Sequence, residues 1–484
     1  MFDEASSSAP GMRIRPLAAC LAAVCGVAAA APAFADAAKT SPATPATIFV
    51  TNCNDSGAGS LRDAIDNAAN EDTINLTTLA CSTISLTTGA LTIGQDSLAF
   101  VGPGQGELTI DASNNNNQNA FYHLGGGSLL LQDMTIANGS KYRNDVTTRG
   151  GCIHSESNVL LRNVTVENCF NKSASIYGAL GGAIWSGGQT YMTHSTVTGS
   201  AAFAGGNGYA SGGGIYTNGG ILALYSLVEG NSAYSFSATP SFGGGIFVRG
   251  YSGIFECAVA YNSSTRMGGL ALADNGTSIA NVFNSTISGN FADLIGGVYS
   301  RRPLYLYNST IANNFARYSE ANGVAKGTGL HMGPQLLTVQ SSIIANNGSL
   351  AATHYDFGGE QGVLLTGSHN LFTSSAWAPP PDTIGGPVNL DTLTDNGGVT
   401  PTMALLPGGF GIDEGAMPPA GIFPNDQRGT GFSRLNGGAV DMGAFESDPD
   451  RIFTNGFNFQ APLVARPLPI ARRSMDDSSS SDSG

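Results

Sequence analysis

Three side chains that could recognise a sugar stand at equal steps along the chain. His194, Tyr225 and Glu256 are 31 residues apart and offer an imidazole, an aromatic ring and a carboxylate. Aromatic rings supply flat apolar contact area, and the other two groups can hydrogen-bond hydroxyls. Stacked units of this length would bring the three into an outward column, with about 4.8 Å between neighbours. We therefore treat them as a hypothetical glycan-binding strip.

The same station can also be interpreted as a tight polar bend. Asparagine suits such a bend because it tolerates left-handed backbone. It occupies the equivalent place in other units, at Asn163, Asn284 and Asn308. The two interpretations differ in whether the side chains contact a ligand, and the sequence leaves both open.

Catalytic chemistry has weaker support. Hydrolysis of a glycosidic bond requires two carboxyl groups about 5–9.5 Å apart. Glu167 and Glu229 fall in register two units apart, at about 9.6 Å, but no motif marks them as a catalytic pair. We predict a non-catalytic protein that binds polysaccharide or acts as an adhesin, with no cofactor and no catalytic residue. A polysaccharide lyase or glycoside hydrolase is the alternative.

Metal ligation is not indicated. The chain has no Cys-x-x-Cys motif, and five histidines lack the close spacing of ligand pairs: His123, His154, His331, His354 and His369. We interpret these histidines as surface or turn residues, and Arg301-Arg302 as a solvated turn.

A sequence repeat must position all of these side chains. Gly-Gly-x-Ile stations recur every 31 residues, at 150–153, 181–184, 212–215 and 243–246. A second station in each unit supplies a β-branched residue: Val166, Val197, Val228, Val259, Ile287, Ile311 and Ile344. Short β-branched runs broken by Gly and Asn indicate strands and turns rather than helices.

A unit of this size cannot bury its own apolar face, so the units must stack. The sequence therefore predicts an all-β fold, a single right-handed parallel β-helix with about 31 residues per coil. The β-branched column would fill the bore. Asparagines three to five places later would form a hydrogen-bonded ladder in left-handed backbone: Asn231, Asn262, Asn290, Asn314 and Asn347.

The two ends of the chain differ from the repeats. Ser60 is expected to cap a short helix whose apolar residues, from Leu61 to Ala68, recur at helical spacing. The predicted segments are an N-terminal cap over 49–95, the β-helix over 96–375, a distinct C-terminal cap over 376–447 and a disordered tail over 448–484. A linker over 36–48 precedes them.

The first 35 residues are typical of a secretory signal peptide. Met12 begins a basic start, an apolar run follows, and Ala33-Phe34-Ala35 supplies the cleavage pattern. A lipobox-like sequence before Cys20 leaves a lipid-modified N-terminus as the alternative. In an oxidising compartment the five remaining cysteines predict the pairs Cys53–Cys81 and Cys152–Cys169, with Cys257 free.

Charge narrows the partners. The formal net charge is −14, which repels the phosphate backbone of nucleic acids. A uronate polymer would need local Arg to overcome this field. No apolar run of 18 residues occurs, so no transmembrane segment is expected. The predicted partner is a polysaccharide or the surface of a host or neighbouring cell.

Three segments carry a resemblance to known families. The stretch from Asn52 to Ile65 resembles the CSLREA-type motif of exported bacterial β-helix proteins, and the coils resemble polymorphic outer-membrane-protein repeats. The stretches 393–402, 426–429 and 441–446 resemble a choice-of-anchor Q domain. The resemblance implies a secreted or surface-exposed bacterial β-helix protein, and it implies no catalytic residues.

Overall fold

The computed structural model describes residues 44–174, 176–236, 239–273, 278–318, 327–351, 353–417 and 423–448. The predicted signal peptide, most of the predicted linker and all of the predicted tail except Asp448 lie outside these residues. The described residues up to Ser447 belong to one compact unit.

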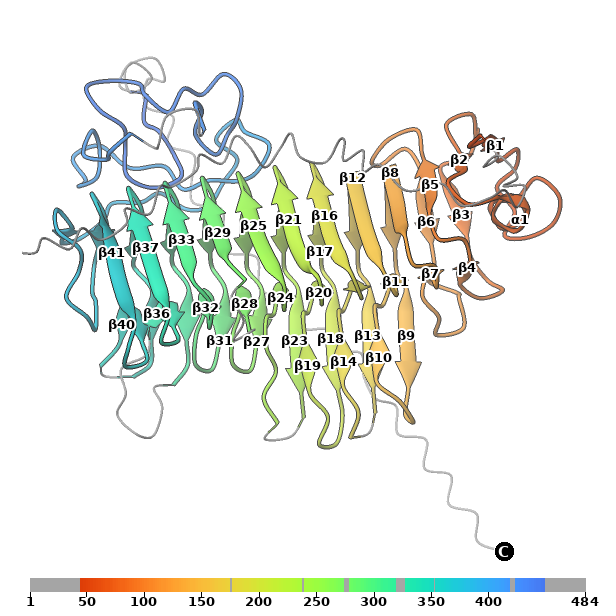
Figure 1. Ribbon diagram of the computed structural model, residues 1–484, viewed down its shortest axis with the longest axis horizontal. Coiled ribbons are helices and arrows are strands. Elements are labelled where there is room, and N and C mark those ends of the chain that lie inside the picture. Colours follow the sequence, from red (N-terminus) through yellow and green to blue (C-terminus); the bar gives the residue numbers. More distant parts are fainter. Residues whose placement is uncertain are drawn as a thin grey trace, which may run out of the picture. The chain divides into compact units, whose positions relative to one another are not determined.

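Strands stack along one axis, as the repeat predicts (Figure 1). Ile153 pairs with Ile184 and Ile184 pairs with Ile215, in parallel, so one step of the stack is one 31-residue repeat. The predicted all-β parallel β-helix is confirmed.

Each coil contributes strands to up to four stacks. The sheet B strands follow the Gly-Gly-x-Ile stations: β4 (Leu91–Ile93), β7 (Phe121–His123), β11 (Ile153–Ser155), β15 (Ile184–Ser186), β20 (Ile215–Thr217), β24 (Ile246–Val248), β28 (Leu270–Leu272), β32 (Val298–Ser300), β36 (Gly327–Met332) and β40 (Tyr355–Gly359). Sheet C comprises β9 (Ser140–Arg143), β13 (Phe170–Ser173), β18 (Ala201–Ala204), β23 (Ser232–Ser235), β27 (Ser263–Ser264), β31 (Phe291–Ala292), β35 (Phe315–Ala316) and β39 (Gly348–Ser349). Sheet D is short and comprises β10 (Thr148–Arg149), β14 (Ala179–Leu180) and β19 (Ala210–Ser211).

Sheet A is the largest stack and is bent in the middle. Its strands before the bend are β5 (Leu98–Val101), β16 (Gln189–Thr193), β21 (Gly220–Leu224), β25 (Tyr251–Phe255), β29 (Ala280–Phe283), β33 (Leu304–Tyr307), β37 (Leu336–Gln340) and β41 (Leu364–Ser368). Those after it are β6 (Thr109–Asp111), β17 (Thr196–Thr198), β22 (Leu227–Glu229), β26 (Ala258–Ala260), β30 (Thr286–Ser288), β34 (Thr310–Ala312), β38 (Ile343–Ala345), β42 (Leu371–Phe372) and β43 (Ile384–Gly385). The longer β8 (Ser128–Ala137) and β12 (Asn158–Glu167) run through the bend, and β1 (Thr47–Phe49), β2 (Thr73–Asn75) and β3 (Thr83–Ser85) join the same sheet.

The predicted β-branched column fills the bore. All seven of its residues, from Val166 to Ile344, are buried within the main hydrophobic cluster. Side chains of one type therefore lie above one another at each strand spacing, which gives close packing along the axis.

The predicted asparagine ladder forms at the next corner. The side-chain oxygen of each Asn accepts the amide N–H of the Asn one coil earlier, for example Asn231 N to Asn262 Oδ1 at 3.0 Å and Asn262 N to Asn290 Oδ1 at 2.9 Å. The left-handed residue was predicted wrongly by one place, since positive φ falls on the preceding residue, as in Tyr261 and Asn313. The ladder Asn instead turns its side chain inward, where the buried backbone needs partners.

The N-terminal helix is confirmed as α1 (Leu61–Asn67). Ser60 caps it by accepting from the Asp63 amide at 3.2 Å, and Leu61, Ala64 and Ile65 are buried in the core. The solenoid nevertheless begins earlier than the predicted boundary at residue 96, because β1 already pairs in parallel with β2 and β2 with β5.

Both predicted disulfides are present. Cys53 pairs with Cys81, and Cys152 pairs with Cys169, while Cys257 is free and buried. The second disulfide joins the Gly-Gly-x-Ile corner to the position that holds Asn in later coils. In those coils the same two places are a glycine and the ladder Asn that packs against it, such as Gly214 and Asn231. The disulfide thus replaces one rung of the ladder.

The C-terminal segment is distinct from the coils, as predicted, and lies along their side. Its isolated bridges are antiparallel, for example Leu390–Leu405 and Asn425–Ser433. It contacts the bends of coils far back in the chain: the Gln427 side chain accepts from Thr286 at 2.6 Å, and the Thr310 hydroxyl accepts from the Ala444 amide at 3.0 Å. In Figure 1 this segment rises above β29 to β41 rather than closing the bore alone.

Candidate functional site

The bend of sheet A places one residue per coil in left-handed backbone. We call these residues the bend column: Asp133, Asn163, His194, Tyr225, Glu256, Asn284, Asn308, Ser341 and His369, with φ between 45° and 54°. The bend therefore exists as the second interpretation predicts. Asn and Asp accept this conformation readily, whereas His, Tyr and Glu adopt it at a cost of roughly 1–2 kcal/mol each.

The structure brings His194, Tyr225 and Glu256 together. The rings of His194 and Tyr225 stack with centroids 5.0 Å apart and an interplanar angle of 26°. The Tyr225 side chain hydrogen-bonds Glu256 on its other side. Burial, together with this contact, raises the pKa of Tyr225 to about 12. The 31-residue register alone predicts this arrangement.

Only part of this strip faces solvent. Glu256 is 4% exposed, because the C-terminal segment covers it, and the Thr400 hydroxyl donates to its carbonyl at 3.2 Å. Burial raises the pKa of Glu256. Tyr225 has one ring face on His194 and lies beside Gly429 of the C-terminal segment. His194 is the exposed member of the strip.

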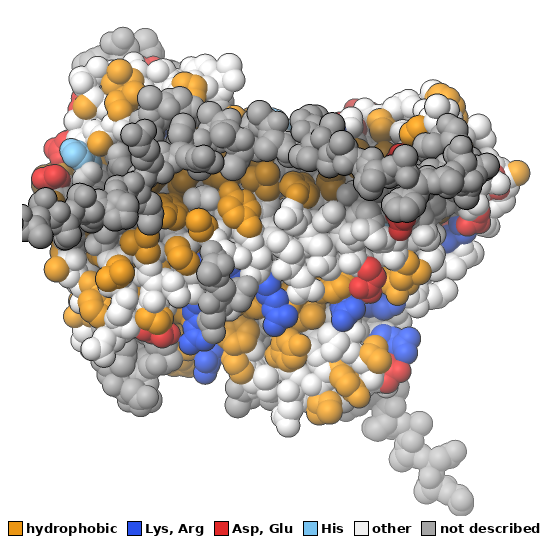
Figure 2. Space-filling model, in the orientation of Figure 1, with side chains coloured by type: hydrophobic (Ala, Val, Ile, Leu, Met, Phe, Trp, Pro, Cys, Tyr) orange, Lys and Arg blue, Asp and Glu red, His pale blue; other side chains and the backbone are white. Residues whose placement is uncertain are grey.

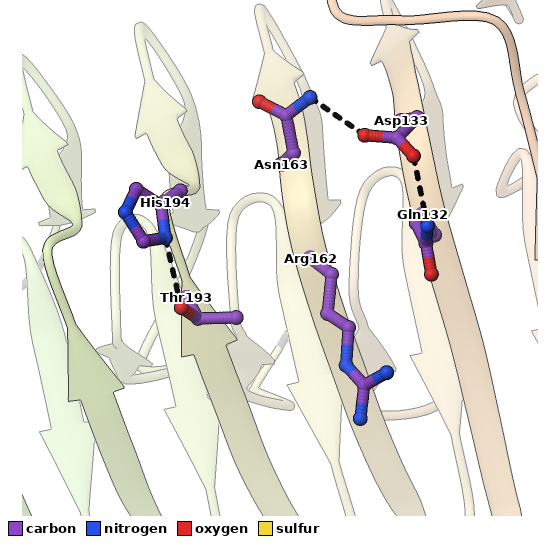
Figure 3. A pocket seen from close by; sticks show the side chains of 6 residues that line it. All are labelled: Gln132, Asp133, Arg162, Asn163, Thr193 and His194. Atoms are coloured by element: carbon purple, nitrogen blue, oxygen red, sulfur yellow. Dashed lines mark hydrogen bonds between the residues drawn. The ribbon is translucent and has the colours of Figure 1, made fainter.

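A pocket of about 400 Å³ opens beside His194, at the part of the bend column that the C-terminal segment leaves uncovered (Figure 3). Three consecutive coils line it with polar side chains: Gln132, Asp133, Arg162, Asn163, Thr193 and His194. Gln105, from the loop after β5, donates to the His194 carbonyl at 3.1 Å and borders the site.

Hydrogen bonds within the pocket fix its acidic end. The Asp133 carboxylate accepts from the Asn163 amide at 2.6 Å and from the Gln132 amide at 2.8 Å. Thr193 and His194 Nδ1 share a hydrogen bond of 3.0 Å. Arg162 is exposed and extends along its strand in Figure 3. The pocket therefore offers donors and acceptors within a few ångströms of one another.

The sequence analysis missed half of these residues. Gln132, Arg162 and Thr193 each stand one place before a bend residue, so they share one lane on the outer face of sheet A. The 31-residue register contains this signal. It is visible only once the bend station is known to turn the chain, because the turn is what gathers the preceding lane into a pocket.

The other candidate carboxylates fall where the register places them. Glu167 and Glu229 occupy the same lane, with Thr198 between them. Burial raises the pKa of Glu229. Among the residues that the structure describes, no group of three His, Cys, Asp or Glu side chains is arranged to hold a metal ion.

Two interpretations of basic residues were wrong. His123, His154 and His331 are buried strand residues of sheet B rather than surface or turn histidines, because strand alternation directs them against neighbouring coils. Arg301 is exposed, but Arg302 is fully buried and donates to the carbonyls of Val248, Arg249 and Gly250. The predicted solvated turn thus holds an internal cation.

The described part of the chain has no helix long and apolar enough to cross a membrane. No protein-family model matches the sequence, and no curated protein matches it either.

Proposed function

We propose that this is an exported β-helix protein that binds polysaccharide without cleaving it. The observation that carries the proposal is His194, an exposed imidazole held in left-handed backbone beside a pocket of hydrogen-bonding side chains. Strained positions that persist at a surface pocket point to a function for the side chain. Asn would relieve this strain and stands at the same station one coil earlier.

The chemistry of the pocket suits hydroxyl groups held in a fixed pattern. Asp133 accepts hydrogen bonds, Arg162 donates them, and the amides of Gln132 and Asn163 do both. The His194 ring has one face on Tyr225 and presents the rest to the pocket side. An array of this kind on three coils fits consecutive units of a polymer that lies along the solenoid.

Export is supported by the signal-peptide pattern and by two disulfides, because disulfides persist in oxidising compartments. The CSLREA-like and choice-of-anchor-Q-like segments support the same proposal, a secreted or surface-exposed bacterial protein of adhesin-like character. In the folded chain the choice-of-anchor-Q-like segments pack together against the coils, with Gln427 donating to Thr400 and Pro401.

A glycan array, run beside a reducing-sugar release assay on the retained polymers, tests this proposal. We expect retention of at least one polysaccharide with no release of reducing ends. His194→Ala should abolish retention. His369→Ala is the matched control, since His369 occupies the same station in the same conformation away from the pocket. Equal retention by wild type and His194→Ala would contradict the pocket, and release of reducing ends would favour the enzymatic alternative.

A further inference from the structure

A second line of side chains follows the Gly-Gly-x-Ile stations on sheet B. The residue directly after each Ile, Leu or Val points outward, and we call this line the aromatic column: Tyr122, His154, Trp185, Tyr216, Phe247, Tyr299 and His331. Tyr122, His154 and Trp185 contact in sequence, with centroids 4.7 Å apart at each step. Tyr216 and Phe247 stack at 5.0 Å.

A trough of about 430 Å³ opens where these two runs meet, between sheet B and the neighbouring lane of sheet D. Its floor is formed by Trp185, Tyr216 and Phe247, which also belong to a hydrophobic cluster outside the bore. Tyr209 forms one wall and is 43% exposed, and Asn218 adds an amide. The trough is thus apolar below and polar at its rim.

One buried polar atom in the floor lacks a partner. Trp185 is 3% exposed, and its Nε1 makes no hydrogen bond. An indole N–H is a donor only, so a buried one without an acceptor is costly. An oxygen of a bound ligand in the trough would satisfy it.

Two arginines flank the trough. Arg149 lies over the Trp185 ring at 4.4 Å and 3.5 Å from Glu156, and its Nε also lacks a hydrogen-bond partner. Arg249 is exposed, and within the described residues its guanidinium has no ion-pair partner. Figure 2 shows Lys and Arg side chains among hydrophobic ones along the face that carries β11, β24 and β32 in Figure 1.

We propose that this trough is a second binding site and that it takes an acidic polysaccharide of the uronate type. The chain as a whole, at −14, repels anions, so a local pair of arginines on an aromatic floor selects for a ligand that needs both. Guanidinium groups bind carboxylates with paired hydrogen bonds, and the apolar face of a sugar ring packs on aromatic surface. The site is separate from the bend column and does not depend on it.

Affinity electrophoresis in gels containing polygalacturonate tests the site at 0.15 M salt. A parallel gel with methyl-esterified polygalacturonate presents the same backbone with its carboxylates masked. We expect wild type to be retarded by the acid form and Arg249→Gln to bind it about tenfold more weakly, the loss typical of one charge-assisted hydrogen bond. Retardation by the esterified polymer should be much smaller.

Arg317→Gln is the control for net charge, because Arg317 sits in an exposed pair with Asp293 on another face and removes the same charge. Tyr209→Ala, at the exposed wall, should weaken binding without unfolding the protein. Equal binding by wild type and Arg249→Gln, an equal loss with Arg317→Gln, or equal affinity for the esterified polymer would each overturn the proposal. His194→Ala should bind polygalacturonate as wild type does, so failure of the bend pocket and failure of the trough are distinguishable.

Discussion

The Sγ atom of Cys257 accepts a hydrogen bond from the Ser226 amide at 3.4 Å, in the place that a serine hydroxyl fills in neighbouring coils. The Ser195 amide donates to Ser226 Oγ at 3.2 Å, and the Cys257 amide donates to Ser285 Oγ at 3.1 Å. A second ladder therefore follows the bend column. Cys257 belongs to it as an analogue of serine rather than as a reactive thiol.

Cys257→Ser should leave the free energy of unfolding within about 0.5 kcal/mol of wild type, because the hydroxyl can take both hydrogen bonds of the thiol. Cys257→Ala should cost about 1–3 kcal/mol, since it leaves the buried Ser226 amide without an acceptor. Urea unfolding measures both. Equal stability of the Ala and Ser variants would show that the ladder position carries no energy.

The thiol itself should be inert in the folded protein. Burial raises the pKa of Cys257 to about 12, against about 8.5 for a free cysteine. The folded state therefore retains the proton above pH 8.5, so this group stabilises the fold below that pH and the contribution is lost as the pH rises toward 12. A thiol reagent at pH 8 should label Cys257 only after unfolding. Labelling of the native protein at the rate of a free thiol would contradict this.

Asn290→Ala should be among the most destabilising single changes in the coils. The Asn290 side chain accepts from the Asn262 amide at 2.9 Å and donates to the Val259 carbonyl at 2.9 Å, and both partners are buried. Its removal leaves two unsatisfied backbone groups, at about 1–3 kcal/mol each. Urea unfolding should place Asn290→Ala several kcal/mol below Asn144→Ala, an exposed control. A difference under 1 kcal/mol would mean that water replaces the rung.

The C-terminal segment should loosen as the pH rises. Its buried cluster holds three carboxylates, Asp426, Asp441 and Glu446, against Arg428 and Arg434, so one proton brings it to neutrality. Burial raises the pKa of Glu446 to about 8, above about 4.3 in an unfolded chain. The folded state keeps the proton between these values, so the stabilisation is complete below pH 4.3 and is lost as the pH rises through 8.

Hydrogen exchange of amides in 423–446 between pH 6 and pH 9, corrected for the intrinsic rate, measures this loosening. Glu446→Gln keeps the side chain neutral and should flatten the dependence. Glu414→Gln, an exposed change in the same segment, should leave it as in wild type. An unchanged pH dependence in Glu446→Gln would place the titrating group elsewhere.

Periodicity explains how much of this structure the sequence predicts. Residues such as Val197 and Val228 repeat at 31 because parallel pairing puts like above like, so the fold, the bend station and both disulfides follow from counting. The contact between Thr286 and Gln427 does not repeat and spans 141 residues, so no period marks it. The covering of Glu256 was therefore not predictable. The ladder was assigned the wrong backbone because Asn is favoured both in left-handed turns and as an inward-facing partner.

The last prediction separates structure from function at the bend pocket. His194→Asn replaces a side chain that is strained in left-handed backbone with one that tolerates it, as Asn163 does one coil earlier. The free energy of unfolding should rise by about 0.5–1 kcal/mol, the usual gain when such strain is relieved. Polysaccharide retention should fall, because Asn lacks the ring that borders the pocket. His369→Asn should gain similar stability and keep full retention. If His194→Asn is stabilised and still binds as wild type does, the imidazole serves no ligand and the bend column is structural alone.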